Sequence, residues 1–328
     1  MEALRGETVI QTLELFGGVG SPRVAFRNIG VPIKSIDYVE IDEKAVRSYN
    51  AMFKKDLGYK TQTIIGWNLK PDILIHGSPC QDFSIAGHQK GADVGSETKS
   101  SLMWETIHII QQMGIWKPKI VIWENVKNVL SKHMRHNFNR YLDEMQKMGY
   151  QSSFEILNAM DFGLPQNRNR VFTISCLNGT LFNFKTLETK ETKNISDFLE
   201  NTEEEKYIVT QPSMLKRINY KDGNFGGRVE IIKDCCNTIT TKQMRCPNSG
   251  VVDLGNGKYR YLTERECWRL QGYSDEDFNN ALKVHPGIKG KLNGALYKQA
   301  GNSIPVPIFE SIFKQIIAEW NNEKLKAV

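Results

Sequence analysis

The chain has few of the features that place a protein in a membrane or outside the cell. No apolar run approaches the ~18 residues that cross a bilayer, and residues 1–20 contain no basic stretch followed by an apolar core and a cleavage site. The six cysteines lack the paired short spacings of a zinc site or of a small disulfide framework. We therefore expect a soluble, cytoplasmic protein with reduced thiols and no bound metal.

The excess of charge of one sign is also small. The 43 Lys and Arg residues exceed the 37 Asp and Glu residues by 6, and the pI is about 8.8. Such a balance permits nucleic acid as a partner but does not identify one. The 328 residues, 40% of them hydrophobic, suffice for one large domain and a small one, at ~100–200 residues per domain.

Short β-rich runs alternate with helical stretches over residues 9–126. The expected strands are Val9–Phe16, Ile36–Ile41, Thr63–Gly66, Asp72–His76 and Lys119–Trp123, followed by Ser152–Leu157 and Arg170–Ser175 after the helical stretch Asn137–Met148. This alternation predicts a parallel sheet covered by helices.

The second half of the chain changes character. Leu187–Lys206 is rich in Thr, Glu and Lys, which favours an exposed linker, and residues 207–260 lose any periodicity, which indicates a separate loop-rich lobe. Thr263 precedes Glu266 by three positions, the spacing of a capping box that starts a helix. We expect this helix to run to Gly272.

A last helix, Val306–Trp320, carries its apolar residues on one face. The residues of that face are Ile308, Phe309, Ile312, Phe313, Ile316 and Ile317. We expect the face to pack against the sheet of the first domain. Two cysteines, Cys176 and Cys267, are expected to be ordinary core residues.

A glycine-containing turn follows the first expected strand. Phe16–Gly20 precedes Ser21, a good N-cap, and Pro22, which is favoured at the first helical position, while Gly30 can close that helix. Glu40 lies about twenty residues further on, where a carboxylate can accept hydrogen bonds from ribose hydroxyls. The pattern indicates a nucleoside-cofactor site, although a tight structural turn explains the glycines alone nearly as well.

Cys80 has the sequence context of a presented nucleophile. It follows a buried-strand pattern and Pro79, and it precedes the polar run Gln81–Ser84 and a loop, Ile85–Ser100, with the composition of a mobile lid. Glu124 ends a second apolar strand, and ligand sites gather at the carboxyl ends of strands in open α/β sheets. The thiol and the carboxyl group are therefore expected to share one pocket.

A thiol needs cationic neighbours to ionise near neutral pH. Arg168 and Arg170 are candidates, although two exposed loop arginines remain the simpler interpretation of their spacing alone.

Taken together in their order, these segments resemble the DNA (cytosine-5)-methyltransferases of the compact type found in bacterial and phage restriction-modification systems. The matching segments are Phe16–Gly20, Glu40, Ser78–Gln81, Glu124–Val126, Gln166–Arg170, Arg265–Gly272 and Gln299–Ser303. The resemblance implies a Rossmann-like methyltransferase fold, with a mixed, mostly parallel sheet and helices on both faces. It also implies three segments: a catalytic S-adenosylmethionine-binding domain at 1–178, a target-recognition domain at 179–262, and a returning segment at 263–328.

The resemblance implies the chemistry as well. S-adenosylmethionine donates a methyl group to C5 of a cytosine in double-stranded DNA, after the Cys80 thiolate adds to C6 of a flipped-out base. Glu124 holds N3 and the exocyclic amino group, which requires a carboxyl group that is at least partly protonated. Arg170 binds the cytosine O2, and Arg168 helps to position the base and the nucleophile.

The resemblance also assigns binding residues. The cofactor pocket comprises Phe16, Gly18, Gly20, Glu40, Ile41, Asn68, Pro79, Leu102, Asn302 and Ser303. The expected DNA contacts are Gln81, Ser84, Thr238, Thr240, Lys242, Gln243 and Arg245. Asn68 stands where the family usually has an aspartate facing the adenine amino group, so weaker cofactor recognition is expected. The implied protein is a monomer that binds no membrane, with a cognate restriction endonuclease as a functional counterpart.

Three alternatives stay open. Transfer-RNA cytosine-5 methyltransferases are related, but they usually carry Pro-Pro-Cys where this chain has Ser78-Pro79-Cys80. A catalytically silent DNA-binding homologue would typically lose the nucleophile or the glycine loop, and both are present. An α/β dehydrogenase would explain the glycine loop but neither Cys80 nor the basic character of the lobe, where nine Lys and Arg residues stand against four Asp and Glu residues between Gln211 and Arg260.

Overall fold

The computed structural model describes most of the chain. The described residues are 9–53, 58–64, 70–78, 102–177, 179–218, 229–245 and 247–326. Several predicted site residues lie outside them, namely Asn68, Pro79, Cys80, Gln81 and Ser84.

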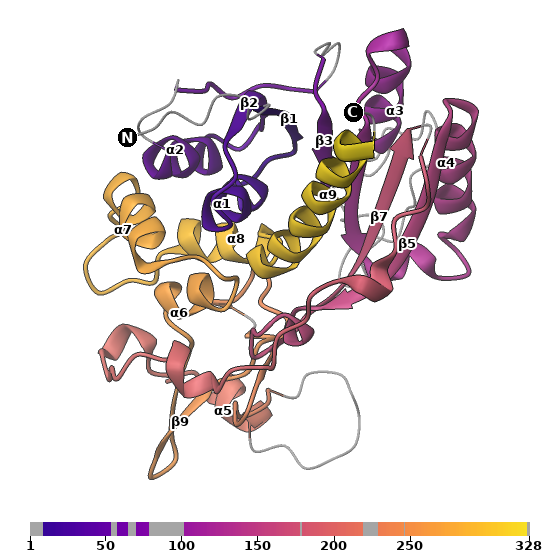
Figure 1. Ribbon diagram of the computed structural model, residues 1–328. Coiled ribbons are helices and arrows are strands. Elements are labelled where there is room, and N and C mark those ends of the chain that lie inside the picture. The colour runs from indigo at the N-terminus through magenta and orange to yellow at the C-terminus, as the bar shows by residue number, and fades with distance from the viewer. Residues whose placement is uncertain are drawn as a thin grey trace.

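A six-stranded sheet in the order β2-β1-β3-β4-β7-β5 lies at the centre of the described structure (Figure 1). Its strands are β1 (Ile10–Leu15), β2 (Ile33–Val39), β3 (Ile73–His76), β4 (Ile120–Val126), β5 (Tyr150–Asn158) and β7 (Asn169–Leu177). The pairs β1–β2, β1–β3 and β3–β4 are parallel, whereas β7 runs antiparallel to β4 and β5. The predicted mixed, mostly parallel sheet is confirmed. Because β2 and β3 flank β1 on opposite sides, the strand order reverses there and opens a crevice at the carboxyl end of β1.

Helices cover both faces of the sheet. They are α1 (Ser21–Asn28), α2 (Glu43–Met52), α3 (Met103–Gln112), α4 (Arg135–Lys147) and α9 (Val306–Lys326). Successive strand residues point to opposite faces. Accordingly, Ile73 and Ile75 of β3 join the core cluster that includes α1 and α9, whereas Leu74 joins the cluster that includes α3 and α4 (Figure 1).

Helix α9 confirms the prediction for the end of the chain. The residues Ile308, Phe309, Ile312, Phe313 and Ile316 are buried, and the Phe313 ring stacks on Phe26 of α1 with 3.8 Å between centroids. The helix therefore completes one covering layer of the sheet. Cys267 is fully buried in the same core cluster, and Cys176 is half-buried against it, which agrees with the core roles expected for them.

The remaining elements are short and lie mostly below the sheet in Figure 1. They are β6 (Gln166–Asn167), α5 (Pro212–Ile218), β8 (Cys236–Asn237), β9 (Val252–Gly255), β10 (Lys258–Arg260), α6 (Glu264–Arg269), α7 (Asp275–Val284), α8 (Gly294–Asn302) and the 3-10 turns η2 (Gly114–Trp116), η3 (Lys127–Leu130), η4 (Ala159–Asp161), η5 (Phe184–Thr186), η6 (Ile195–Phe198) and η7 (Glu205–Tyr207). A separate small core forms there around Val209, Met214, Val251 and Tyr259. The boundaries expected after residues 178 and 262 stay predictions. No helix in the described part of the chain has the length and apolar character needed to cross a bilayer.

Ser21 is not the N-cap that the sequence predicts. Helix α1 begins at Ser21 itself, and Gly20 precedes it with φ 80° and ψ 41°. Gly20 favours this left-handed conformation because it has no Cβ, and an added Cβ would come within 2.6 Å of the Tyr49 ring. The Ser21 hydroxyl instead lies 2.6 Å from the Tyr273 hydroxyl, which joins the first helix to the C-terminal segment.

Two other boundaries differ from expectation. Thr63 and Ile64, the described part of the expected strand Thr63–Gly66, belong to no strand, although the preceding Gln62 donates its N–H to the Glu40 carbonyl at 2.7 Å. The capping box at the start of α6 is confirmed, but the helix ends at Arg269.

The expected linker Leu187–Lys206 lies against the body of the protein. Leu187 and Ile195 are buried in the core cluster of α9, and the Ser311 hydroxyl of α9 donates to the Glu188 carbonyl at 2.8 Å. Most of its side chains are exposed, which accounts for its polar composition, whereas its few apolar residues anchor it to the core.

Candidate active site

The glycine loop after β1 is held by side chains beneath and beside it. The Gly18 N–H donates to Glu40 Oε2 at 2.9 Å, and the Tyr38 hydroxyl donates to the Gly18 carbonyl at 2.5 Å. An added Cβ at Gly17 would come within 2.5 Å of the Tyr38 ring, so only glycine fits against that ring. Glu40 Oε1 also accepts the N–H groups of Ile41 and Asp42. The loop and the end of β2 are thus fixed together by one carboxylate.

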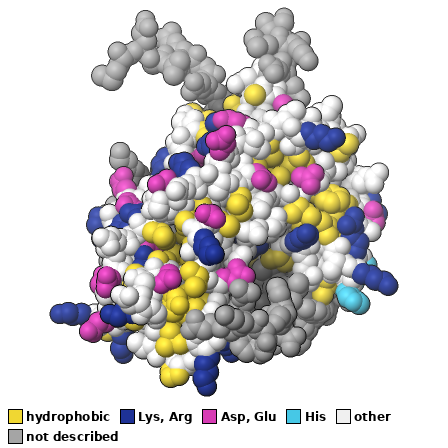
Figure 2. All heavy atoms as spheres, turned by 90° about the horizontal axis from the view of Figure 1, so that it is seen from below, with side chains coloured by type: hydrophobic (Ala, Val, Ile, Leu, Met, Phe, Trp, Pro, Cys, Tyr) yellow, Lys and Arg dark blue, Asp and Glu magenta, His cyan; other side chains and the backbone are white. Residues whose placement is uncertain are grey.

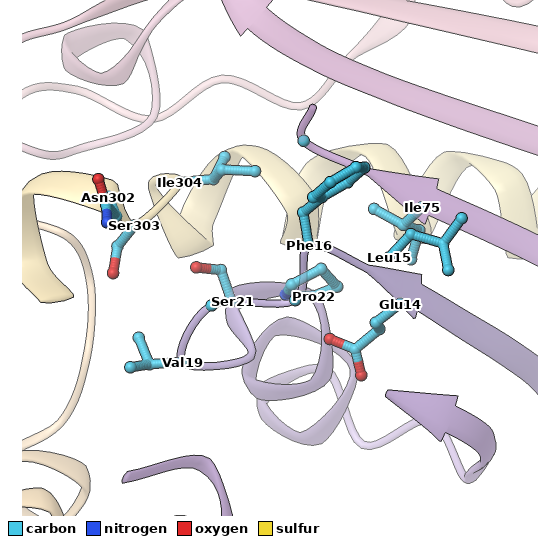
Figure 3. Close-up of a pocket in the computed structure, with 13 residues that line it drawn as sticks. Glu14, Leu15, Phe16, Val19, Ser21, Pro22, Ile75, Asn302, Ser303 and Ile304 are labelled. Carbon is cyan, nitrogen blue, oxygen red and sulfur yellow. The ribbon is translucent and has the colours of Figure 1, made fainter. Parts of the chain in front are cut away.

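A pocket opens at this loop, at the carboxyl end of β1 (Figure 3). It is lined by Glu14, Leu15, Phe16, Gly17, Gly18, Val19, Ser21, Pro22, Ile75, Gly77, Asn302, Ser303 and Ile304. Four residues expected at the cofactor line it, and Figure 3 shows that Phe16 approaches it from the side opposite Asn302 and Ser303. The structure therefore brings the C-terminal segment to the glycine loop.

Other residues expected at the cofactor lie near this pocket but do not line it. Gly20 ends the loop, Glu40 holds it, and Ile41 is 76% exposed beyond the end of β2. Leu102 precedes α3 and packs half-buried in the second core cluster.

Glu14 lines the pocket and was not expected from the sequence. It is a buried carboxyl group one residue before the end of β1, and burial raises its pKa from 4.5 to about 7 against the opposing effects of Arg23 and Tyr49. The Tyr49 hydroxyl donates to Oε1 at 2.9 Å, while Oε2 has no hydrogen-bond partner among the described residues. Its place at the carboxyl end of β1, directly before the glycine loop, is the sequence signal that could have identified it.

The expected catalytic carboxyl group and an arginine meet at the ends of β4 and β7. Arg170 Nε lies 3.1 Å from Glu124 Oε1, and both side chains are largely buried. Burial raises the pKa of Glu124, and the positive charges of Arg170 and Arg168 oppose that rise. A Cβ added at Gly77 would lie 3.7 Å from Glu124 Oε2, so the chain passes beside Glu124 three residues before Cys80.

Arg168 is buried, and its side chain joins three parts of the chain. Its Nη1 donates to the Ile239 carbonyl at 2.9 Å, and its Nη2 donates to the carbonyls of Gly301 at 3.1 Å and Ser303 at 2.8 Å. The interpretation of Arg168 as an exposed loop residue is therefore wrong. Arg168 directly precedes β7, so its guanidinium connects the start of this strand with the expected recognition segment and with a residue that lines the pocket.

Gln166 makes the same connection and was not predicted. Its Oε1 accepts the Ile239 N–H at 3.1 Å, and its Nε2 donates to the Leu270 carbonyl at 2.8 Å. The Ile239 peptide is therefore held at its N–H by Gln166 and at its carbonyl by Arg168. Parallel pairing of β6 with β8 continues this contact along the backbone.

The residues expected to contact DNA fall into two groups. Lys242 and Arg245 are exposed, and Thr238 and Thr240 are half-buried, with the Thr238 hydroxyl donating to the Asn167 carbonyl at 2.9 Å. Gln243 is fully buried and donates to the Ser249 hydroxyl. This arrangement holds Gln243 inside the lobe and does not present it to a base edge.

Comparisons with known proteins agree with this geometry. Residues 10–318 match the family model described as C-5 cytosine-specific DNA methylase. The chain is 32% identical to the type II methyltransferase M2.ScrFI of Lactococcus lactis subsp. cremoris over 94% of this chain and 99% of the relative. It is 31% identical to the type II methyltransferase M.Bsp6I of Bacillus sp. (strain RFL6), over 94% of this chain and 98% of that relative.

Solved structures share the fold. The S. pombe Dnmt2 methyltransferase superposes with a TM-score of 0.73 at 19% identity, covering 95% of this chain and 99% of that one. The Entamoeba histolytica methyltransferase EhMeth superposes with a TM-score of 0.74 at 20% identity, covering 96% and 99%. With the family model spanning nearly the whole chain, the protein belongs to the C-5 cytosine-specific DNA methylase family.

Proposed function

We propose that this DNA cytosine-5 methyltransferase modifies one short sequence of duplex DNA, with S-adenosylmethionine as methyl donor and Cys80 as covalent nucleophile. The observation that carries the proposal is the buried Glu124–Arg170 pair beside Gly77, because it places an acid and a hydrogen-bond donor next to the segment that leads to Cys80. Family membership supplies the reaction.

The pocket at the glycine loop fits the proposed donor. Glu14 Oε2 is buried without a hydrogen-bond partner among the described residues, which suits a ligand with positive charge or hydrogen-bond donors, and Glu40 Oε2 retains one lone pair for a ribose hydroxyl. Phe16, Asn302 and Ser303 line the same space. When bound there, S-adenosylmethionine supplies an electrophilic methyl group on a sulfonium.

The proposed chemistry begins at Cys80. Its thiolate adds to C6 of the flipped cytosine, and the electron pair displaced from the ring makes C5 nucleophilic. Glu124 donates a proton to N3 as negative charge develops, for which burial prepares it by raising its pKa. Arg170, next to Glu124, donates to the cytosine O2. Once C5 carries the methyl group, its proton leaves, the S–C6 bond breaks, and the N3 proton returns to Glu124.

Recognition is proposed for the lobe held by Gln166 and Arg168. Thr238, Thr240, Lys242 and Arg245 lie on or beside the segment around Ile239, where side chains can reach base edges and phosphates. The protein is proposed to act as a cytoplasmic monomer in self-protection of DNA. The relatives named above are type II methyltransferases, and an orphan methyltransferase of Bacillus phage SPR is 26% identical.

Bisulfite sequencing of DNA from cells that express the chain tests this proposal. Complete protection of cytosines at one short site is expected, and clean conversion everywhere would contradict it. A Cys80→Ala variant should abolish both methylation and covalent capture of a 5-fluorocytosine duplex. Transfer RNA assayed in parallel tests the alternative substrate, and methylation of transfer RNA alone would replace DNA in the proposal.

A further inference from the structure

We propose that a basic surface formed by η3 and the start of α4 binds backbone phosphates of the duplex beside the flipped cytosine. The basic surface consists of Lys127, Lys132, His133, Arg135 and His136. This inference rests on the proposed function and extends the DNA contacts from the recognition lobe to the catalytic domain.

The basic surface begins next to the Glu124–Arg170 pair. Lys127 follows Glu124 by three residues, because η3 starts where β4 ends. Val126, the last residue of β4, pairs across the sheet with Arg170. η3 also contacts β7 and α4, so its position relative to Arg170 is set by packing. A duplex whose cytosine enters this site must bring its backbone close to that position.

The segment of the chain that carries this surface contains no acidic residue. Residues 125–142 contain no Asp or Glu, and Lys127, Lys132, His133 and His136 are exposed. Figure 2, which views the molecule from below, shows Lys, Arg and His side chains close together at the right-hand edge, under α4. The surface therefore presents positive charge that attracts an anionic backbone.

Lys127 and Lys132 form no ion pair with any described carboxylate, in contrast to Lys298, which pairs with Asp42, and Lys314, which pairs with Glu188. What distinguishes Lys127 and Lys132 from other exposed lysines is their place next to the Glu124–Arg170 pair. Lysines at that place can contact the phosphates of a duplex whose cytosine enters the site.

Arg135 supports the surface from below. Its Nε donates to Asn139 Oδ1 at 3.2 Å, and its guanidinium lies 5.5 Å from the ring centroids of Phe138 and Phe154. These contacts hold the first turn of α4 against β5. Because these contacts hold the Arg135 side chain, Lys127 and Lys132 are the residues that we expect to contact phosphates.

The basic surface and the recognition lobe both adjoin the start of β7. Arg168, which holds Ile239 of the lobe, is two residues from Arg170, and Arg170 is paired with the residue before Lys127. Phosphate contacts carry no sequence information but fix the orientation of a duplex. Lys127 and Lys132 are therefore expected to strengthen binding to all duplexes equally.

The test compares two double variants with equal loss of charge. Lys127→Gln with Lys132→Gln removes the proposed contacts. Lys34→Gln with Lys70→Gln removes two exposed lysines near the amino ends of β2 and β3, whereas Lys127 follows the carboxyl end of β4, which runs parallel to β3. The affinity for a duplex oligonucleotide carrying the mapped site, and for one without it, is measured over a range of KCl concentrations.

We expect the first variant to make the slope of log K against log salt shallower by about 1.8 on both duplexes, since each phosphate contact contributes about 0.9. The control variant should keep the wild-type slope. A wild-type slope in the Lys127/Lys132 variant overturns the inference while leaving bisulfite protection, and so the proposed function, intact. A slope change seen with transfer RNA and absent with duplex DNA would equally overturn it. Failure of the wild type to protect any cytosine, with the slope change present, would sink the proposed function alone.

Discussion

Single residues at the site differ in how far local sequence reveals them. Glu124 could be predicted because an acid directly after an apolar strand falls at the ligand-binding edge of an α/β sheet. Glu14 could not be assigned a role in the same way, because its burial depends on Tyr49 from α2 and on the C-terminal segment that closes the pocket. Cys80 lies outside the described residues, so its role stays a prediction.

Replacing Glu14 by glutamine should change how stability depends on pH. Burial raises the pKa of this carboxyl group from 4.5 to about 7, so its ionisation favours the unfolded chain. The wild type should lose stability as pH rises through that interval, and above it the loss should level off at about 3 kcal/mol. Glu14→Gln cannot ionise and should not show this loss.

The measurement is urea unfolding of both proteins over this pH range. Only the pH-dependent part of their difference matters, because a buried amide can add a constant offset. A difference in unfolding free energy that stays constant across the interval would exclude a raised pKa for Glu14.

Replacing Arg170 should move the pH dependence of methylation. The Arg170 charge opposes the rise in the pKa of Glu124, so Arg170→Gln should let Glu124 keep its proton to higher pH. We expect a lower kcat/KM and an alkaline limb that shifts upward. Arg170→Lys keeps the charge and should keep the limb in place while losing the planar contact to O2. If the alkaline limb stays in place in both variants, Glu124 is not the group that donates the proton.

At the scale of elements, short sequence patterns predicted those features that depend on contacts between residues close together in the chain. The capping box at α6 and the apolar face of α9 follow from spacings of three and four residues, and both are confirmed. The bonds of Arg168 to Ile239, Gly301 and Ser303 span 71, 133 and 135 positions. No local pattern encodes such contacts, which explains why the sequence left the surroundings of Arg168 open.

Because Gln166 and Arg168 fix the Ile239 peptide by hydrogen bonds, we predict that replacing Gln166 weakens recognition of the target sequence. Gln166→Leu leaves the Ile239 N–H and the Leu270 carbonyl unpaired, at a cost of about 1–3 kcal/mol each. We expect at least a tenfold fall in kcat/KM at the mapped site and increased methylation at sites that differ by one base pair.

Gln271→Leu is the matched control. Gln271 is also fully buried and donates to the Ala300 carbonyl at 2.8 Å, so its side-chain hydrogen bond holds the C-terminal segment and not the Ile239 peptide. It should lose stability while keeping the ratio of methylation at the mapped and altered sites. Equal ratios in the two variants would show that Gln166 acts on stability alone.

At the scale of the whole molecule, the first and last parts of the chain form one core. The Phe26 and Phe313 rings stack, and Tyr273 reaches both Ser21 and Ser303 with its hydroxyl. Arg27 of α1 and Asp277 of α7 form a two-bonded ion pair at 2.8 and 2.7 Å. The pocket at the glycine loop is therefore assembled only when the C-terminal segment has folded onto that loop.

The packing of α9 on α1 predicts that a substitution far from the candidate active site strongly lowers stability. Phe313→Ala should destabilise the protein by about 3–5 kcal/mol, because it empties a fully buried site between α1, α9 and the sheet. Glu319→Ala, on the exposed side of α9, should cost less than about 0.5 kcal/mol. Urea unfolding checks both values.

Since α1 starts at the pocket and rests on Phe313, the loss of the Phe313 ring should also weaken S-adenosylmethionine binding at temperatures where the variant is still folded. Unchanged binding with the expected destabilisation would mean that the pocket forms without support from α9.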